Sequence, residues 1–130
     1  MRPSTRFMLA AAVVGALVVS SVALAAGGLS GGTYQTNIKS PAQLKGRWAL
    51  TLGKGGAYTV ALDGQPIARG SYSTTATTIT FTRERGSGCT GAGTYAWKKS
   101  GKIVTFARKR ESSTCEARGI VLAHRFTQVR

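Results

Sequence analysis

Acidic side chains are scarce in this chain. Four Asp and Glu residues stand against 18 Lys and Arg residues, for a formal net charge of +14 at pH 7. An excess of this size favours anionic partners such as nucleic acid, anionic lipids, cell-wall polymers or acidic proteins. It also suits a small secreted protein that uses charge only to stay soluble. The composition leaves both explanations open.

Catalytic groups are equally few. His124 is the single histidine, and its phase with Ile120 and Phe126 predicts a packed or rim residue. The sequence shows no acidic pair, Ser-His-Asp set or metal-binding cluster, and an active site needs several such groups to converge. We therefore expect no enzymatic activity, no metal and no other cofactor.

The N-terminal segment has no charged residue at positions 7–26, and Arg2 and Arg6 precede it. Residues 23–25 read Ala-Leu-Ala, a small-x-small cleavage site. A basic start, an apolar run and this site together predict a signal peptide over residues 1–25. The alternative is an uncleaved anchor, because about 20 apolar residues can span a bilayer. Two serines that interrupt the run favour cleavage, so we expect export to the cell envelope or the extracellular space.

Removal of residues 1–25 takes two arginines with it and leaves 105 residues with a net charge of +12, enough for one domain. Glycine occupies four of the six positions 27–32, and glycine loses the most conformational freedom on ordering. We therefore expect a flexible leader over residues 26–39 and a folded domain over residues 40–130.

Cys89 and Cys115 are the only cysteines. In an exported chain an even pair predicts a disulfide, and two isolated cysteines with one distant histidine make poor zinc-ligand spacing. A crosslink over a loop of this length stabilises a fold by roughly 3 kcal/mol in the chain-entropy model. A domain this small benefits from such a crosslink.

From Gly46 onward, apolar and polar residues alternate in short runs separated by turn residues, and no convincing helical period appears. Only residues 40–44, with Ser at the N-cap position and Pro after it, predict a single helical turn. Strands are expected at residues 48–52, 58–62, 66–73, 77–83, 93–98, 102–108 and 118–129, the last one bent or divided.

A meander of seven or eight short strands with tight connections favours an all-β, up-and-down antiparallel barrel, because closure removes the sheet edges. An open two-sheet sandwich is the alternative.

Successive strands of a meander run in opposite directions, so alternate connections lie at the same end of the barrel. Cys89 and Cys115 fall in connections that share one end, here called the first end, where a disulfide can form. The four acids fall there too: Asp63, Glu84, Glu111 and Glu116. At the opposite, second end we expect an anion-binding surface, the second-end rim, made of Lys54, Lys98, Lys99, Lys102 and Arg130.

Gly46 and Trp48 form a Gly-x-Trp that follows the helical turn and opens the meander, and this arrangement resembles the lipocalin-like (calycin) domains. The resemblance implies that Trp48 closes the base of the barrel and that an arginine from the last strand packs across it. Arg118 is the best candidate, because it shares parity with Ile120, and Arg125 is the alternative. A guanidinium over an indole face is also physically favourable.

The chain is also similar to small secreted bacterial proteins that have a Cys-x-Gly-x-Gly-Thr-Tyr-x-Trp stretch and a later Cys followed by Arg. That likeness implies no particular activity. The matching positions are Cys89, Gly91, Gly93, Thr94, Tyr95, Trp97, Cys115 and Arg118.

Inward side chains can nearly fill a barrel this short. The bulky aromatic residues either do so or cap a small apolar lumen, and they are Trp48, Tyr58, Phe81, Tyr95 and Trp97.

We expect a secreted, non-enzymatic, lipocalin-like binding protein whose short barrel holds a small apolar ligand. One alternative is a protein-interaction module, such as an inhibitor of a secreted hydrolase that inserts residues 85–91 into a cleft. Another is an electrostatic binder of anionic envelope polymers or lipids through the second-end rim. Specific nucleic-acid binding is disfavoured, because the aromatics that would stack on bases point inward by parity.

Overall fold

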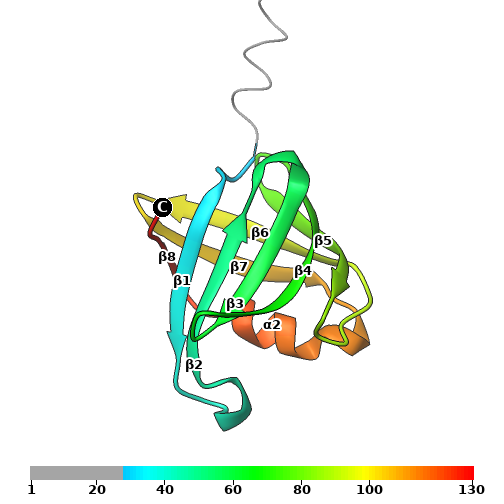
Figure 1. The fold of residues 1–130 in the computed structure, drawn as a ribbon. Coiled ribbons are helices and arrows are strands. Elements are labelled where there is room, and N and C mark those ends of the chain that lie inside the picture. Colours follow the sequence, from blue (N-terminus) through cyan, green and yellow to red (C-terminus); the bar gives the residue numbers. More distant parts are fainter. Residues whose placement is uncertain (1–27) are drawn as a thin grey trace, which may run out of the picture.

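The computed structural model describes residues 28–130, which form one closed barrel of antiparallel strands ordered β1 to β8 (Figure 1). The predicted signal peptide lies outside the described residues. The strands are β1 (Gly32–Ile38), β2 (Gly46–Leu52), β3 (Ala57–Leu62), β4 (Gln65–Thr74), β5 (Thr78–Arg85), β6 (Gly93–Ser100), β7 (Ile103–Arg110) and β8 (Phe126–Gln128). The helical segments are η1 (Ala42–Leu44), η2 (Lys54–Gly56), η3 (Ser113–Cys115) and α2 (Glu116–Leu122). The all-β meander and its closure into a barrel are confirmed.

The first strand of the barrel lies where a flexible leader was expected. The leader over residues 26–39 is wrong from Gly32 onward, because β1 pairs along its whole length with β2 and over two residues with β8. Tyr34 is fully buried, and its hydroxyl donates to the carbonyl of Ser30 at 2.7 Å. The Thr, Tyr and Ile side chains of β1 favour a strand, and they outweigh the disorder that the preceding glycines suggest.

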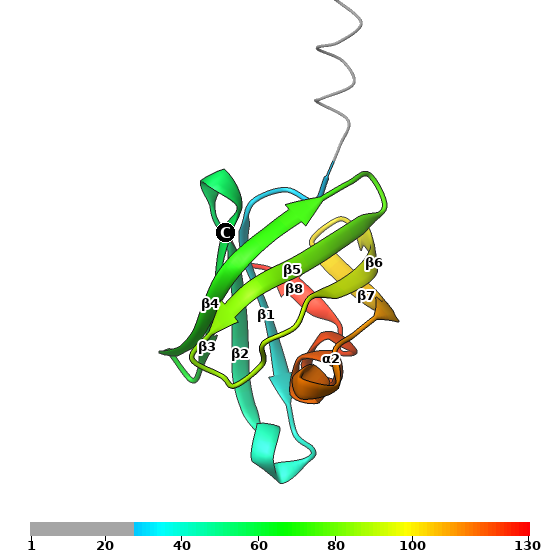
Figure 2. The same ribbon diagram turned by 90° about the vertical axis from the view of Figure 1, so that its right-hand side faces the viewer.

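The expected last strand, residues 118–129, is wrong over its first half. Residues 116–122 form α2 at the first end of the barrel, and β8 follows it (Figures 1 and 2). Val121 and Leu122 are buried, whereas Ile120, which two-residue alternation placed inside, is 37% exposed. This burial pattern has a helical period, because the segment covers the end of the barrel instead of extending its wall.

A β-bulge reverses the side-chain alternation near the end of β5. Phe81 is buried, and simple alternation would turn Arg83 inward as well. Opposite this point β4 has one residue, Gly70, where β5 has two, and Arg83 takes a left-handed φ of 55°. The extra residue shifts the parity, so Glu84 turns into the barrel and Arg83 stays exposed.

A second bulge has the same effect at the end of β7. The register between β6 and β7 shifts between Thr94 and Tyr95, which leaves Lys109 as the extra residue. Glu111, directly after β7, therefore turns inward, and its side chain is only 1% exposed. The two bulges bring one carboxylate from β5 and one from the end of β7, the two strands that flank β6, to the first end.

Aromatic rings packed edge to face fill much of the interior. The ring centres of Tyr58 and Phe81 are 5.1 Å apart, and those of Phe81 and Tyr95 are 6.1 Å apart. Phe106 and Phe126 form a third pair at 5.7 Å. Such pairs add about 0.5–1.5 kcal/mol to the effect of burial alone.

At the bulge residue Arg83, a glycine variant should be more stable than an alanine variant, which is the reverse of the order in a regular strand. In an ordinary strand Gly is less stable than Ala by about 0.5–1 kcal/mol, whereas at a left-handed φ the alanine is strained. We therefore expect Arg83→Gly to have a free energy of unfolding about 1 kcal/mol higher than Arg83→Ala in denaturant titrations. At Arg85 the order should be the ordinary one. The same order at both positions would contradict the bulge.

Candidate functional site

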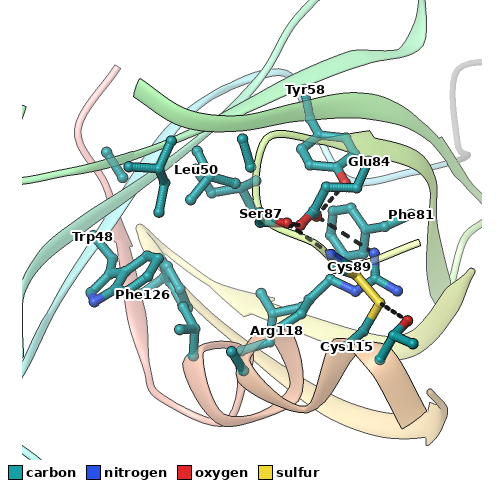
Figure 3. A pocket seen from close by; sticks show the side chains of 18 residues that line it. Trp48, Leu50, Tyr58, Phe81, Glu84, Ser87, Cys89, Cys115, Arg118 and Phe126 are labelled. Carbon is teal, nitrogen blue, oxygen red and sulfur yellow. Dashed lines mark hydrogen bonds and ion pairs between the residues drawn. A yellow bond between two sulfur atoms is a disulfide. The ribbon is translucent and has the colours of Figure 1, made fainter. Parts of the chain in front are cut away.

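A cavity of about 110 Å³ lies inside the first end of the barrel, between the barrel wall and α2 (Figure 3). Strands β2 to β5 and β8 supply one side of it, and α2 supplies the other. Its lining is mostly apolar and includes Trp48, Leu50, Val60, Ala68, Leu122 and Phe126.

The cavity reaches the surface beside the disulfide. Three of its lining residues are exposed, Ser87, Thr114 and Ala117, so its mouth lies between the β5–β6 connection and the start of α2. Cys89 and Cys115 line the cavity at the same place, with Cα atoms 4.6 Å apart. The predicted disulfide is confirmed, and it ties the two sides of the mouth together.

The polar side of the cavity is one buried ion cluster centred on Arg118. Its Nε donates to Oε2 of Glu111 at 2.9 Å, and its Nη2 donates to Oε1 of the same carboxylate at 2.6 Å. Nη2 also donates to the carbonyl of Gly91 at 2.8 Å, and the hydroxyl of Tyr95 donates to Glu111. Bidentate Arg–carboxylate contacts of this kind are among the stronger hydrogen-bonded contacts in proteins.

Glu84, from β5 on the far side of β6, completes the ion cluster. The hydroxyl of Tyr58 donates to its Oε1 at 2.6 Å, and the hydroxyl of Ser87 donates to its Oε2. Nη1 of Arg118 is buried without a hydrogen bond among the described residues, and Oε1 of Glu84 lies 3.5 Å from it. Both oxygens of this carboxylate are thus occupied by hydroxyl donors, as Figure 3 shows for Glu84 and its neighbours.

Burial and hydrogen bonding act in opposite directions on the ion cluster. Burial alone would raise the pKa of Glu111, but the hydrogen bonds from Arg118 and Tyr95 outweigh it and lower that pKa. Burial would also lower the pKa of Arg118, but contact with Glu111 raises it above its ordinary value. The pKa of Tyr58 and of Tyr95 is raised, first by burial and then by the neighbouring carboxylate. At neutral pH, Arg118 and Glu111 are therefore charged and both tyrosines are protonated.

The predicted barrel-base residues lie in two different places. Gly46 opens β2, and Trp48 is buried in the same strand, with its indole nitrogen donating to the carbonyl of Leu44 at 2.7 Å. Arg118 belongs to α2 and not to the last strand, which corrects the expectation. Its guanidinium carbon lies 6.0 Å from the ring centre of Phe81, so Phe81 and not Trp48 is the aromatic partner that the structure gives it.

Of the four predicted lumen residues, two line the cavity and two do not. Tyr58 and Phe81 line the cavity. Tyr95 is buried beside Phe81 and directs its hydroxyl to Glu111. Trp97 is half-buried near the second end, where its indole nitrogen donates to the carbonyl of Thr78 at 3.2 Å.

The residues of the second-end rim are exposed at the barrel end opposite the cavity. Lys98, Lys99 and Lys102 belong to the β6–β7 hairpin, whereas Lys54 lies in η2, between β2 and β3 on the other side of the barrel. Arg130 lies between these two groups, because its carbonyl accepts from the amide of Thr33 in β1. The positive charges of the rim are therefore spread around the second end.

Sequence reasoning missed the ion cluster. Glu84 and Glu111 each follow a bulge, and a two-residue alternation carried through the bulge turns them outward. A signal for α2 was present, since Val121 and Leu122 follow Arg118 at three and four residues and Glu116 supplies an acid in the first turn.

The single histidine and the potential metal ligands of residues 28–130 were also located. His124 is half-buried just beyond α2, with its Nδ1 3.0 Å from the carbonyl of Ile120. Among residues 28–130, no three His, Cys, Asp or Glu side chains gather where they could hold a metal ion. No helix in this range is long and apolar enough to cross a bilayer. No protein-family model, curated protein or solved structure matches the chain.

Arg118→Met should destabilise the protein strongly, because it leaves buried carboxylates without a counter-charge. Removing one partner of a buried ion pair costs about 3–5 kcal/mol, and we expect a loss of this size in the free energy of unfolding at about pH 7. Arg108→Met is the matched control, since Arg108 pairs with Glu116 while their side chains are 44% and 62% exposed. An exposed pair contributes less than about 1 kcal/mol. Equal losses would contradict the ion cluster.

The loss of unfolding free energy caused by Arg118→Met should become smaller as the pH is lowered from about 7 to about 5. In the wild type the lowered pKa of Glu111 contributes stability above the unfolded value of about 4.3, which is lost only as the pH falls through the folded pKa. In the variant, Glu111 stays buried without Arg118 and takes up a proton more readily than in the unfolded chain, so acid favours the folded state. Denaturant titrations at both pH values measure this, and a deficit that grows on acidification would refute it.

At high pH the wild type should lose stability through Tyr58 and Tyr95. Their raised folded pKa means that their contribution is complete below the unfolded value of about 10 and is lost as the pH rises from there toward the folded pKa. Each tyrosine adds a slope of up to about 1.4 kcal/mol per pH unit. The double variant Tyr58→Phe/Tyr95→Phe should show a shallower fall between about pH 9 and 11, and an identical slope would count against the assignment.

Proposed function

We propose that this chain is a secreted, non-enzymatic binding protein of lipocalin-like design that holds a small, mainly apolar molecule in the cavity beneath α2. The observation that carries the proposal is a mainly apolar cavity inside the first end of the barrel that reaches the surface beside the disulfide. A ligand that enters the cavity removes apolar lining from water, which favours binding by about 25 cal/mol per Å² of apolar surface buried.

The size of the cavity limits the ligand. An engineered cavity of about 150 Å³ with apolar walls binds benzene, whereas drug-sized ligands occupy about 300–1,000 Å³. A cavity of about 110 Å³ therefore holds a molecule slightly smaller than benzene, or the apolar end of a longer one whose remainder leaves through the mouth. A cavity of this size suits a short barrel that inward side chains nearly fill.

The polar groups beside the cavity support binding. Ser87 and Tyr58 donate to Glu84, and Arg118 and Tyr95 donate to Glu111. These hydrogen bonds hold both carboxylates in fixed positions beside the apolar lining, so they can orient a bound molecule. The disulfide at the mouth is consistent with the oxidising compartment that a secreted protein enters.

Binding can be measured through Trp48, which lines the cavity. The chain has two tryptophans, so Trp97→Phe leaves Trp48 as the only indole. We expect butylbenzene, whose alkyl chain fits the cavity while its ring extends through the mouth, to change the fluorescence of that variant in a saturable way. Native mass spectrometry of the oxidised protein, purified gently from its own host, should show a small adduct that is lost on denaturation. Failure of both measurements would overturn the proposal.

Filling the cavity should abolish binding without unfolding the protein. Ala68 is buried, lines the cavity and pairs with Val60, so Ala68→Leu places additional carbon atoms in the cavity. We expect saturable binding to disappear, while the free energy of unfolding changes by less than about 1.5 kcal/mol. Ala107→Leu is the control, because Ala107 is exposed on β7 and does not line the cavity. Unchanged binding in a folded Ala68→Leu variant would place the ligand elsewhere.

A further inference from the structure

Three exposed arginines line one hollow on the outer face of the barrel, across β3, β4 and β5. Arg69 comes from β4, and Arg83 and Arg85 come from β5. Thr59 and Ser71 line the same hollow and add hydroxyl groups. We call these five residues the arginine hollow.

The positive charges of the arginine hollow repel one another. Arg69 and Arg85 are directly opposite partners in the β4–β5 register, an arrangement that destabilises a sheet when the charges are alike. The left-handed backbone of Arg83 adds strain. In the described part of the chain, none of the three arginines forms an ion pair with an acid.

The one acid near these arginines is turned away from them. Glu84 stands between Arg83 and Arg85 in the sequence, but its side chain is only 6% exposed and bonds to Tyr58 and Ser87. The bulge that supplies the ion cluster with this carboxylate therefore removes it from the outer surface. Glu84 also lines the hollow, but its carboxylate is buried in the ion cluster, so the three exposed arginines carry a charge of about +3 with no exposed acid among the lining residues.

We propose that the arginine hollow binds a phosphate group carried as a monoester dianion. Guanidinium groups donate two parallel hydrogen bonds to such an oxyanion, and three arginines line this hollow together with two hydroxyl-bearing residues. At neutral pH a phosphate monoester carries a charge of about −1.5 to −2, which matches the local excess better than a monoanion does. This site is on the outer surface, so it does not depend on ligand binding in the cavity.

Phenyl phosphate and phenyl sulfate are matched probes, because they share a shape and differ by about one charge at about pH 7.5. In an NMR titration of the oxidised protein at low salt, phenyl phosphate should shift the amides of residues 69–71 and 83–85. Phenyl sulfate should bind about tenfold more weakly. Equal affinities, or phosphate shifts confined to other residues, would overturn the proposal.

Two double variants with the same loss of charge separate the arginine hollow from the general basic excess. Arg69→Gln/Arg85→Gln should weaken phenyl phosphate binding at least about tenfold. It should not lower the melting temperature, because it removes a like-charge pair. Lys98→Gln/Lys99→Gln, in the second-end rim, should weaken binding less than about threefold. Equal effects of the two variants would mean that only net charge matters and would refute the site.

The same variants identify the source of the phosphate. Vesicles with phosphatidic acid present a phosphate monoester, and vesicles with phosphatidylglycerol present a diester. If the arginines recognise a lipid headgroup, the wild type should sediment with the first vesicles more than with the second at equal surface charge, and Arg69→Gln/Arg85→Gln should abolish the difference. If sedimentation is equal while phenyl phosphate still binds, the phosphate belongs to a soluble or polymeric molecule.

Discussion

Arg118 reaches from α2 to two carboxylates that come from different strands, Glu111 after β7 and Glu84 in β5. Charges this deeply buried lose their hydration, and the contact is tolerable only because almost every polar atom in it has a partner. The ion cluster holds α2 against the end of the barrel, together with the disulfide at Cys115. Without that attachment the cavity would have no wall on this side.

Both carboxylates are available only because the strands bulge. At Arg83 and at Lys109, one extra residue shifts the alternation and turns the following acid inward. The shift in β5 also changes the outer face. Because Glu84 turns inward, Arg83 and Arg85 have no acidic side chain between them on that face. One irregularity in β5 therefore accounts for both the closed polar wall of the cavity and the unbalanced charge of the arginine hollow.

Much of the fold could be predicted from the sequence, because alternation and turn residues mark strands well. Strands β2 to β7, the closure of the barrel and the Cys89–Cys115 bond all come from local patterns and from the rule that alternate connections share an end. The prediction failed where local and global preferences differ. Residues 32–38 were not predicted as a strand because several glycines precede and begin them, although the barrel needs β1 for closure. Helix α2 was not predicted because its apolar residues Ile120, Val121 and Leu122 are compatible with a strand as well as with a helix.

The site was harder to predict than the fold. Trp48, Tyr58 and Phe81 were recognised as inward aromatics, and all three line the cavity. Glu84 and Glu111 could not be found, because neither bulge is marked by a glycine: the extra residues are Arg83, at a left-handed φ, and Lys109. The neighbours of Arg118 depend on that register and on α2, so its role followed only from the three-dimensional structure.

A double-mutant cycle on Arg118→Met and Glu111→Gln tests the central claim most directly, since it measures the coupling between the two side chains that hold α2 to the barrel. Denaturant titrations of the wild type, both single variants and the double variant give the coupling free energy. A coupling of about 2 kcal/mol or more is predicted for this buried two-pronged contact. A value below about 0.5 kcal/mol, as found for independent sites, would contradict the account.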